Sequence, residues 1–263
     1  MVYRITDFKQ LDKITSDWDN NFVKICLEGR FGEIYATSET APDSAMFRIN
    51  EIILFGGKPD RELLTFYPPT YKTHFALMMA KGDDEAWYSL IEEVYGDHAE
   101  RITRYATAVH SFDDFKLDVL KETAQTLPEG YKIVPIDEKL YYSCKGDPDF
   151  SDFVAQYATW EEFRDNGVGF VCLYNGDEIA SGISSFADYE GTIELELATK
   201  PSHRRRGLAA AVSARIVLEC ISRGLYPSWD AANIPSLNLS YRFGYHLDHE
   251  YTAYEIEGYN RDR

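Results

Sequence analysis

The sequence predicts a protein of mixed helices and strands, of the α/β (α+β) class. A mixed, mostly antiparallel sheet flanked by helices is expected in its C-terminal half, with a smaller α+β domain before it. Short apolar runs of strand length alternate with longer segments in which apolar residues recur about every 3.6 positions. Turn residues separate these segments, most clearly at 127–130. The 263 residues are enough for two domains, each with its own hydrophobic core.

Residues 1–127 are the predicted N-terminal domain. Their pattern predicts, in order, a helix over 8–18, strands over 22–27 and 52–55, and helices over 84–95 and 112–126. Gly56 and Gly57 are assigned to a turn, because the G-x-x-x-x-G-K-[ST] spacing of a nucleotide-binding loop is absent around them.

Residues 128–263 are the predicted C-terminal domain, which begins after the turn Leu127-Pro128-Glu129-Gly130. A strand over 131–136 precedes helical segments through 140–142 and 150–164. Asn175-Gly176-Asp177 predicts a hairpin turn between strands over 170–174 and 178–187. The expected order continues with a strand over 193–199, a helix over 208–221, a strand over 226–232, a short helix between 233 and 244, and a last strand over 251–256.

The segment 193–209 predicts a strand–turn–helix connection that can bind an anion. Pro201 ends the strand after Thr199, while Gly207 and Ala209 begin the helix. A helix start offers free backbone N–H groups and the positive end of the helix dipole, which suits a pyrophosphate. Small residues at this point let a phosphate approach the backbone closely.

Two motifs carry a resemblance to a known family. Arg204-x-x-Gly207-x-Ala209 is similar to the acyl-CoA-binding signature R/Q-x-x-G-x-G/A of the GNAT acetyltransferase superfamily. The run from Asn233 to Tyr245 resembles its second landmark, N-x-x-A/S-x-x-L-Y-x-K/R-x-G-F. Both motifs occur in the right order, so the sequence is identified as a GNAT member over about half of its length. The whole chain resembles a subgroup with an extra N-terminal domain, which includes zwittermicin-resistance-type acetyltransferases.

The resemblance implies acetyl-CoA as the cosubstrate. Backbone N–H groups after Arg204 would bind the pyrophosphate, and a main-chain N–H near Leu197–Thr199 would polarise the thioester carbonyl. The pantetheine arm would pair with the same strand edge. Asn233 is expected to cap the short helix or to contact CoA. The residues expected at the donor site are Leu197, Ala198, Thr199, Arg204, Arg205, Arg206, Gly207, Leu208, Ala209, Asn233 and Ser236.

Three carboxylates are candidates for the base that takes a proton from an acceptor amine. Glu194 and Glu196 share one face of the predicted strand, and Asp230 follows on the next strand. Either glutamate could instead lie on an exposed strand face or pair with a lysine or arginine, and Asp230 could instead be a turn or cap residue. Ser240 stands where many GNAT members have the tyrosine that protonates the leaving thiolate, with Tyr241 one residue later. A serine is a poor acid but can hydrogen-bond the sulfur, so Ser240 joins the two glutamates as a predicted catalytic residue.

Composition narrows the class of protein. A hydrophobic content of 44% indicates a globular chain, and a net charge of −17 argues against nucleic acid as a partner. Acidity of this size attracts a cationic amine and also keeps a protein soluble. The four cysteines have no metal-ligand spacing, so no metal is expected, and they suggest a reducing compartment. No segment approaches a membrane span, so we expect a cytoplasmic protein without a membrane partner.

The expected activity is direct transfer of an acetyl group from acetyl-CoA to a primary amine of a small molecule. Two alternatives stay open. One is an acyl-CoA-binding sensor with little turnover, which Ser240 favours, and the other is a protein or peptide N-acetyltransferase. The N-terminal domain is either a degenerate GNAT-like unit that completes the substrate cleft or a dimerisation element, so a homodimer also stays open.

Overall fold

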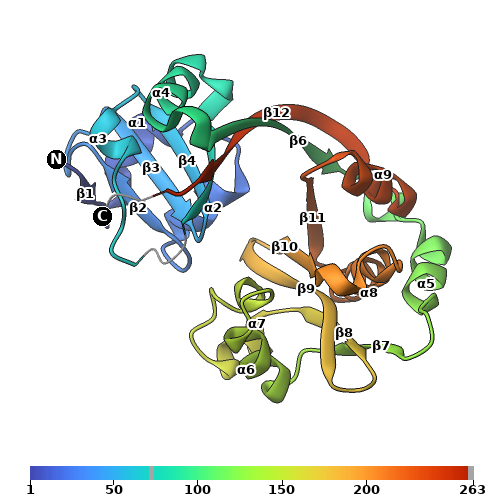
Figure 1. The fold of residues 1–263 in the computed structure, drawn as a ribbon. Coiled ribbons are helices and arrows are strands. Elements are labelled where there is room, and N and C mark those ends of the chain that lie inside the picture. The colour runs from blue at the N-terminus through green and yellow to red at the C-terminus, as the bar shows by residue number, and fades with distance from the viewer. Residues whose placement is uncertain (71–73, 260–263) are drawn as a thin grey trace. The chain divides into compact units, whose positions relative to one another are not determined.

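The computed structural model describes residues 1–70 and 74–259, which form two compact units (Figure 1). Unit 1 contains Met1–Arg104 and the C-terminal segment from Glu250, and unit 2 is Tyr105–His249. The chain enters unit 2 inside strand β6 (Ala99–Ala108) and returns to unit 1 inside strand β12 (His246–Glu257). This division differs from the predicted boundary at 127/128, because each of these two strands begins in one unit and ends in the other.

The sheet of unit 1 combines an antiparallel meander with one parallel pair. Strands β2, β3 and β4 are antiparallel neighbours, β5 runs parallel to β4, and the end of β12 pairs antiparallel with β5. Its order is β1 (Tyr3–Arg4), β2 (Glu33–Ala36), β3 (Ser44–Ile49), β4 (Ile52–Gly57), β5 (Phe75–Ala80) and β12.

Helices cover both faces of this sheet. Leu63 of α3 (Arg61–Leu64) and Trp87 of α4 (Glu85–Tyr95) pack into a core with Phe55, whose ring stacks on Trp87 at 4.6 Å. On β3, Phe47 points to the opposite face and contacts Trp18 at 5.5 Å, next to α1 (Asp12–Thr15) and α2 (Asn21–Glu28).

Three predictions for unit 1 differ from the structure. Gly56 and Gly57, which the sequence assigned to a turn, are the last two residues of β4 and pair with Ala45 and Ser44 of β3. The segment predicted as a strand over 22–27 is helix α2, which Asn20 caps by accepting a hydrogen bond from the Val23 N–H, and which Gly29 ends in the left-handed conformation. A short apolar run does not distinguish a strand from a buried helix, so the caps decide. The helix predicted over 8–18 consists only of a 3-10 turn at Phe8–Leu11 followed by α1. The strand over 52–55 and the helix over 84–95 are confirmed as β4 and α4.

Unit 2 confirms the predicted mixed, mostly antiparallel sheet. All of its neighbouring strands are antiparallel except β10 and β11, which are parallel. Its order is β6, β11 (Tyr226–Ala231), β10 (Thr192–Thr199), β9 (Glu178–Tyr189), β8 (Gly169–Tyr174) and β7 (Tyr131–Pro135).

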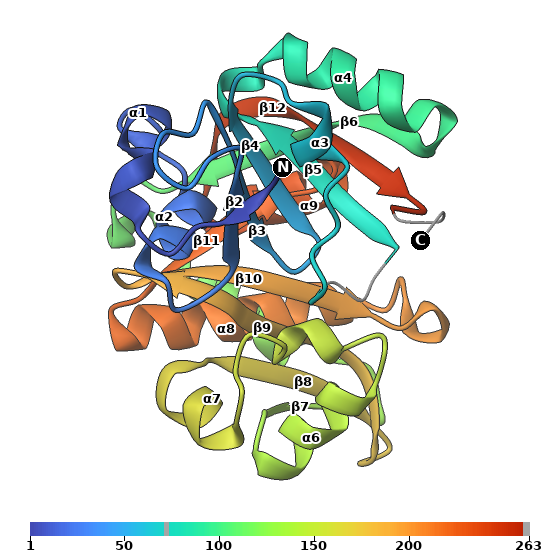
Figure 2. The same cartoon turned by 90° about the vertical axis from the view of Figure 1, so that its left-hand side faces the viewer.

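Five α-helices belong to unit 2. Helix α8 (Leu208–Arg223) buries Val212 and Ile216 against one face of the sheet, and α5 (Leu117–Gln125) packs on it. Helices α6 (Glu138–Gly146) and α7 (Trp160–Asn166) lie side by side on the other face (Figures 1 and 2). The short helix α9 (Ile234–Phe243) follows β11, as predicted.

The two units repeat one order of elements. In each, a first strand is followed by short helices, a three-stranded meander, a helical crossover, a strand parallel to the third strand of the meander, and another helix. The strand that follows the last helix then pairs in the other unit: β6 pairs with β11, and β12 pairs with β5. The exchange of these two strands accounts for the unpredicted division of the chain.

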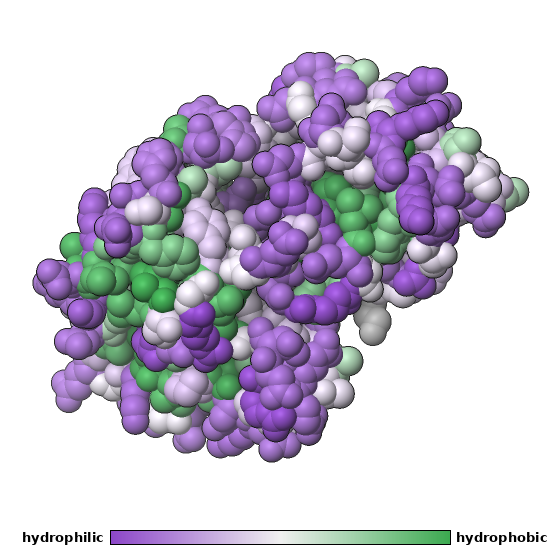
Figure 3. Space-filling view, turned by 180° about the vertical axis from the view of Figure 1, so that it is seen from behind, coloured by the Kyte–Doolittle hydropathy of each residue, from purple (hydrophilic) through white to green (hydrophobic). Residues whose placement is uncertain are grey.

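Polar side chains cover most of the face seen in Figure 3, with apolar areas between them. The large apolar side chains with the most exposure include Phe112, Leu117, Ile234 and Tyr241 in unit 2. Across residues 1–70 and 74–259, every helix is too short or too polar to cross a bilayer.

Candidate functional site

Strands β10 and β11 separate along their length. They pair only from Thr192 with Tyr226 to Glu194 with Ser228, although β10 continues to Thr199. Over the same stretch β10 keeps its partner on the other side, because β9 pairs with it as far as Thr199. Within the described residues, the second half of β10 therefore has a sheet neighbour on one side only.

The backbone groups exposed by this separation are set by the pleat of the strand. The Lys200 N–H donates to the Ala180 carbonyl of β9 at 3.0 Å. Successive peptide groups of a strand point to opposite sides, so the N–H groups of Thr199, Leu197 and Leu195 point to the side from which β11 departs. These are strand-edge donors and acceptors that an extended ligand can pair with, in the way an added strand does.

The turn after β10, residues 200–207, is called the phosphate loop here. It ends in two residues with positive φ, Arg205 at 60° and Gly207 at 80°. Alternation of left-handed and right-handed residues turns successive N–H groups toward one point and forms an anion-binding concavity. A side chain added at Gly207 meets no heavy atom within 4 Å, so the space above this residue is open.

Helix α8 begins at the end of the phosphate loop without a side-chain cap. The first N–H bonded inside the helix is that of Ala211, which donates to the Gly207 carbonyl at 3.1 Å. The N–H groups of Leu208, Ala209 and Ala210 are thus left for a ligand or water. By contrast, α2, α4, α6, α7 and α9 each start with a side chain that accepts from a backbone N–H. The start of α8 therefore suits an anion.

The side chains of the loop supply positive charge at its surface. Arg204, Arg205 and Arg206 are exposed, and in the described part of the chain none of them pairs with a carboxylate. Leu208 contributes only its backbone, because its side chain is 1% exposed in the core under α8. Of the predicted donor contact at Leu208, only the backbone N–H therefore remains possible.

A hollow of about 560 Å³ adjoins Gly207. Arg206 and Arg242 line it together with the C-terminal half of α5, including Glu122 and Thr123. The predicted boundary at 127/128 places this helix in the N-terminal domain, so this wall of the hollow was not predicted. The only available signal was the basic residue of the second motif, Arg242.

Glu194, Glu196 and Asp230 lie on the face of the sheet opposite α8. Their strand neighbours Leu195 and Trp229 pack into the α8 core, so the carboxylates alternate to the other face. Glu194 lies at the last paired position and is 5% exposed. Glu196 and Asp230 are each two residues further on, half-buried on the two strands that separate. The structure thus brings Glu196 and Asp230 to the same level on either side of the opening.

The charge of Glu194 affects the pKa of a neighbouring tyrosine, Tyr226. Burial raises the pKa of Tyr226, and the negative charges of Glu194 and Asp248 raise it further. Glu194 therefore lies close to Tyr226, at the closed end of the strand pair and further from the phosphate loop than Glu196.

Ser240 lies in the interior of unit 2, on helix α9. Its side chain is fully buried, and its hydroxyl donates to the Leu237 carbonyl of the same helix at 2.8 Å. A hydroxyl held in this way is committed to the helix backbone. This geometry argues against the predicted contact between Ser240 and a sulfur atom.

Asn233 and Ser236 order the start of α9. The Asn233 side chain accepts from the Ser236 N–H at 3.0 Å, which confirms the predicted cap. The Ser236 hydroxyl accepts from the Trp229 indole N–H at 3.2 Å and ties α9 to β11. Both side chains have structural partners, and both lie next to the strand that forms one side of the opening.

In unit 1, the two strands that correspond to β10 and β11 do not separate. Strands β4 and β5 pair from Ile52 with Leu77 to Phe55 with Ala80, the last residue of β5. The helix that follows β4 has four residues, and the Asp60 carboxylate accepts from its Leu63 N–H at 2.8 Å. A carboxylate therefore occupies the place that an anion would take.

Comparisons with known proteins agree with this geometry. The family described as GNAT acetyltransferase matches residues 12–254. The uncharacterized N-acetyltransferase YdfB of Bacillus subtilis strain 168 is 26% identical over 231 residues, with 85% of each chain covered. A GCN5-related N-acetyltransferase-like protein of Streptococcus suis is 37% identical, with a TM-score of 0.84 over 95% of this chain and 98% of that one.

A more distant structure has the same fold at low identity. A GNAT-family protein of Novosphingobium aromaticivorans is 12% identical, with a TM-score of 0.53 over 90% of this chain and 97% of that one.

Proposed function

The chain belongs to the GNAT acetyltransferase family, and on this premise we propose that it acetylates a primary amine of a small molecule with acetyl-CoA as the donor. The observation that carries the proposal is the separation of β10 from β11 after Glu194, directly before the phosphate loop. An open strand edge, a concave loop of N–H groups and three exposed arginines follow one another along the chain. This is the set of contacts that an acyl-pantetheine arm joined to a pyrophosphate requires.

The donor is held by the backbone more than by side chains. The start of α8 and the phosphate loop take the pyrophosphate, and Arg206 and Arg242 face the hollow that we assign to the nucleotide end. The free N–H groups at Leu197 and Thr199 lie along the strand edge, where one of them can stabilise charge on the thioester oxygen.

The reaction needs a base but no strong acid. The acceptor nitrogen forms a bond to the acetyl carbon, the carbon–sulfur bond breaks, and a proton passes from the amine to a base. We assign the base to Glu196, because it lies beyond the last paired position while Glu194 is buried at the closed end. Asp230, at the same level on β11, is the second candidate. The leaving group is a thiolate, which departs readily because the pKa of its conjugate thiol is only about 8.5 and which can take a proton from water afterwards, so Ser240 is not required as an acid.

Acidity favours a cationic acceptor. The net charge of −17 draws amines toward the protein, whereas the arginines of the phosphate loop form a local positive area for the donor. We further propose that unit 1 is a second copy of the same arrangement without a donor site, so that each chain binds one acetyl-CoA.

The test is release of free thiol from acetyl-CoA with a panel of small primary amines, and with peptides in parallel. Turnover with small amines supports the proposal, and turnover confined to peptides contradicts it. Acetyl-CoA binding without turnover on any acceptor would identify a sensor instead. Calorimetry gives the binding stoichiometry, for which we expect one site per chain.

A further inference from the structure

The phosphate loop is anchored by two of its own side chains. His203, in the 3-10 turn Pro201–His203, has a side chain that is only 8% exposed, although the three arginines after it are exposed. Lys200, at the start of the loop, is also mostly covered, with 22% of its side chain exposed. These two residues have partners in other elements of unit 2, and neither belongs to the predicted donor contacts.

His203 is held on both ring nitrogens. Its Nε2 lies 3.2 Å from Oε1 of Glu178, and its Nδ1 lies 2.7 Å from the Tyr131 hydroxyl. A carboxylate only accepts, so Nε2 donates to Glu178, while Nδ1 and the Tyr131 hydroxyl share the second hydrogen bond. The ring also lies against Tyr174 at 5.3 Å. His203 therefore joins the loop to β7, β8 and β9.

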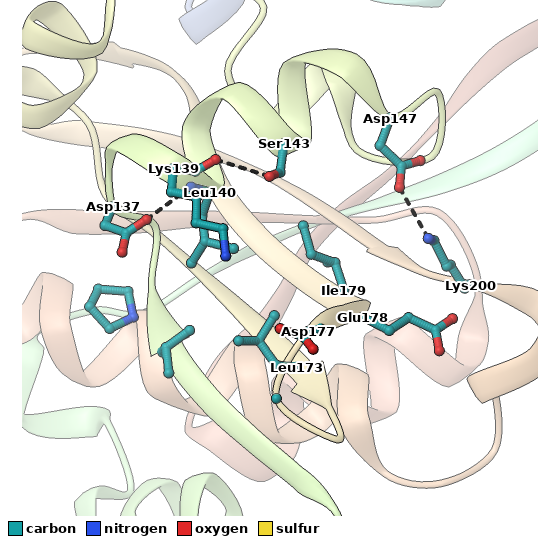
Figure 4. Close-up of a pocket in the computed structure, with 13 residues that line it drawn as sticks. Asp137, Lys139, Leu140, Ser143, Asp147, Leu173, Asp177, Glu178, Ile179 and Lys200 are labelled. Atoms are coloured by element: carbon teal, nitrogen blue, oxygen red, sulfur yellow. Dashed lines mark hydrogen bonds and ion pairs between the residues drawn. The ribbon is translucent and has the colours of Figure 1, made fainter.

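Lys200 makes the second connection, at one end of a pocket of about 480 Å³ (Figure 4). Its ammonium lies 3.0 Å from the Asp147 carboxylate, just after α6, and 5.4 Å from the centre of the Phe150 ring. Glu178, the partner of His203, lines the same pocket. The partners of the two anchors, Asp147 and Glu178, therefore line the same pocket of unit 2.

We infer that His203 is a positioning residue for the phosphates of the donor, with Lys200 as a second anchor. Anchoring holds Arg205 and Gly207 in the left-handed conformations that turn the N–H groups toward one point. Without it, the loop loses its preorganisation and part of the binding free energy is spent on ordering it. The inference rests on the donor site of the proposed function.

The experiment compares two thioesters in binding titrations, which need no acceptor. Acetyl-CoA carries the phosphates, and S-acetylpantetheine has the same thioester arm without the pyrophosphate. We expect His203→Ala to raise the Kd of acetyl-CoA about tenfold, as for loss of preorganisation, and to leave the Kd of S-acetylpantetheine unchanged. His203→Gln keeps a donor for Glu178 and is expected to restore most of the affinity. His98→Ala, at an exposed histidine of unit 1, is the matched control.

The outcomes separate anchoring from general stability. An unchanged Kd for acetyl-CoA in a folded His203→Ala protein overturns the inference, and so does an equal loss for both thioesters. Should His203→Ala fail to fold, Tyr131→Phe decides, because it removes only the hydroxyl on Nδ1. A selective rise in the Kd of acetyl-CoA in that variant supports the inference, and no rise overturns it. If wild-type protein acetylates no amine, the acceptor proposal fails while these titrations still give an answer.

Discussion

Glu194 of β10 lies opposite Ser228 of β11, and in the described chain this is the last position at which the two parallel strands pair. The backbone groups assigned to the donor follow this position along the chain: the open edge of β10, the phosphate loop and the start of α8. The same relationship ranks the candidate bases, because it puts Glu194 at the closed end and Glu196 at the opening. The position at which strand pairing stops therefore distinguishes Glu194 from Glu196.

Gly207→Glu is expected to abolish acetyl-CoA binding. The new side chain would fill the open space over the loop and bring a negative charge to a phosphate position. The positive φ of Gly207 adds strain of roughly 1–2 kcal/mol. Gly191→Glu is the matched control, since Gly191 also has positive φ and open space around it, but in the turn before β10. Thermal melting should show a similar loss of stability in both variants, whereas calorimetry should show loss of acetyl-CoA binding in Gly207→Glu alone. Retained affinity in folded Gly207→Glu would contradict the site.

Glu196→Gln is expected to lower kcat by about 10²-fold or more, as for loss of a general base, with little change in acetyl-CoA affinity. In wild type, kcat/KM should fall as the pH falls, because a protonated carboxylate or amine cannot take part. Glu194→Gln should have the smaller effect on kcat. If both variants keep full kcat, Asp230→Asn becomes the next test, and the assignment to Glu196 is wrong.

Ser240→Ala is expected to change kcat by less than about tenfold and stability by less than about 1 kcal/mol, since one helix back-bond is lost and alanine favours the helix. Ser240→Tyr is expected to lose stability, because the site is fully buried and overpacking costs roughly 1–3 kcal/mol. Steady-state kinetics and denaturant titration measure both. A thousandfold loss of kcat in Ser240→Ala with intact binding would show the serine to be catalytic.

The cysteines are expected to react slowly with Ellman's reagent in the native protein. Burial raises the pKa of Cys172 to about 11 and those of Cys26, Cys144 and Cys220 to about 12, so little thiolate forms at neutral pH. All four should react in guanidinium chloride. Because the folded-state pKa values are raised, their stabilising effect is complete below the ordinary thiol pKa of about 8.5 and is lost as the pH rises through the folded values. Fast reaction of native protein would contradict the burial.

Asn233→Ala is expected to cost about 1 kcal/mol of stability through the lost cap. Asn233→Ser keeps a capping oxygen and should recover most of it. If Asn233 acted mainly on CoA, both variants would weaken acetyl-CoA binding equally, irrespective of their stability, and titrations on the two proteins distinguish these cases.

Most of unit 2 could be predicted from the sequence because its signals are local. The period of α8, the turn at 175–177, the proline after Thr199 and the cap at Asn233 each act within a few residues, and each is present as expected. The phosphate loop could also be predicted from a local signal, because Gly207 and the small residues after it indicate an open helix start whatever segments pack around it. In unit 1 the local signal failed at α2, where a short apolar run fits two structures and flanking caps decide between them.

The sequence by itself determined most elements of unit 2 from β7 onward, their order, and the position of the loop proposed to bind the donor. Strand β6 was not predicted, and the helix expected over 150–164 is a 3-10 turn at Ser151–Phe153 followed by α7. Only the tertiary structure decided that β6 and β12 exchange units, that β10 separates from β11 after Glu194, and that Ser240 faces its own helix. The reason is physical. Periodicity, caps and turns depend on neighbours in the chain, whereas the choice of a strand partner and the register at which pairing stops depend on packing between segments far apart in sequence.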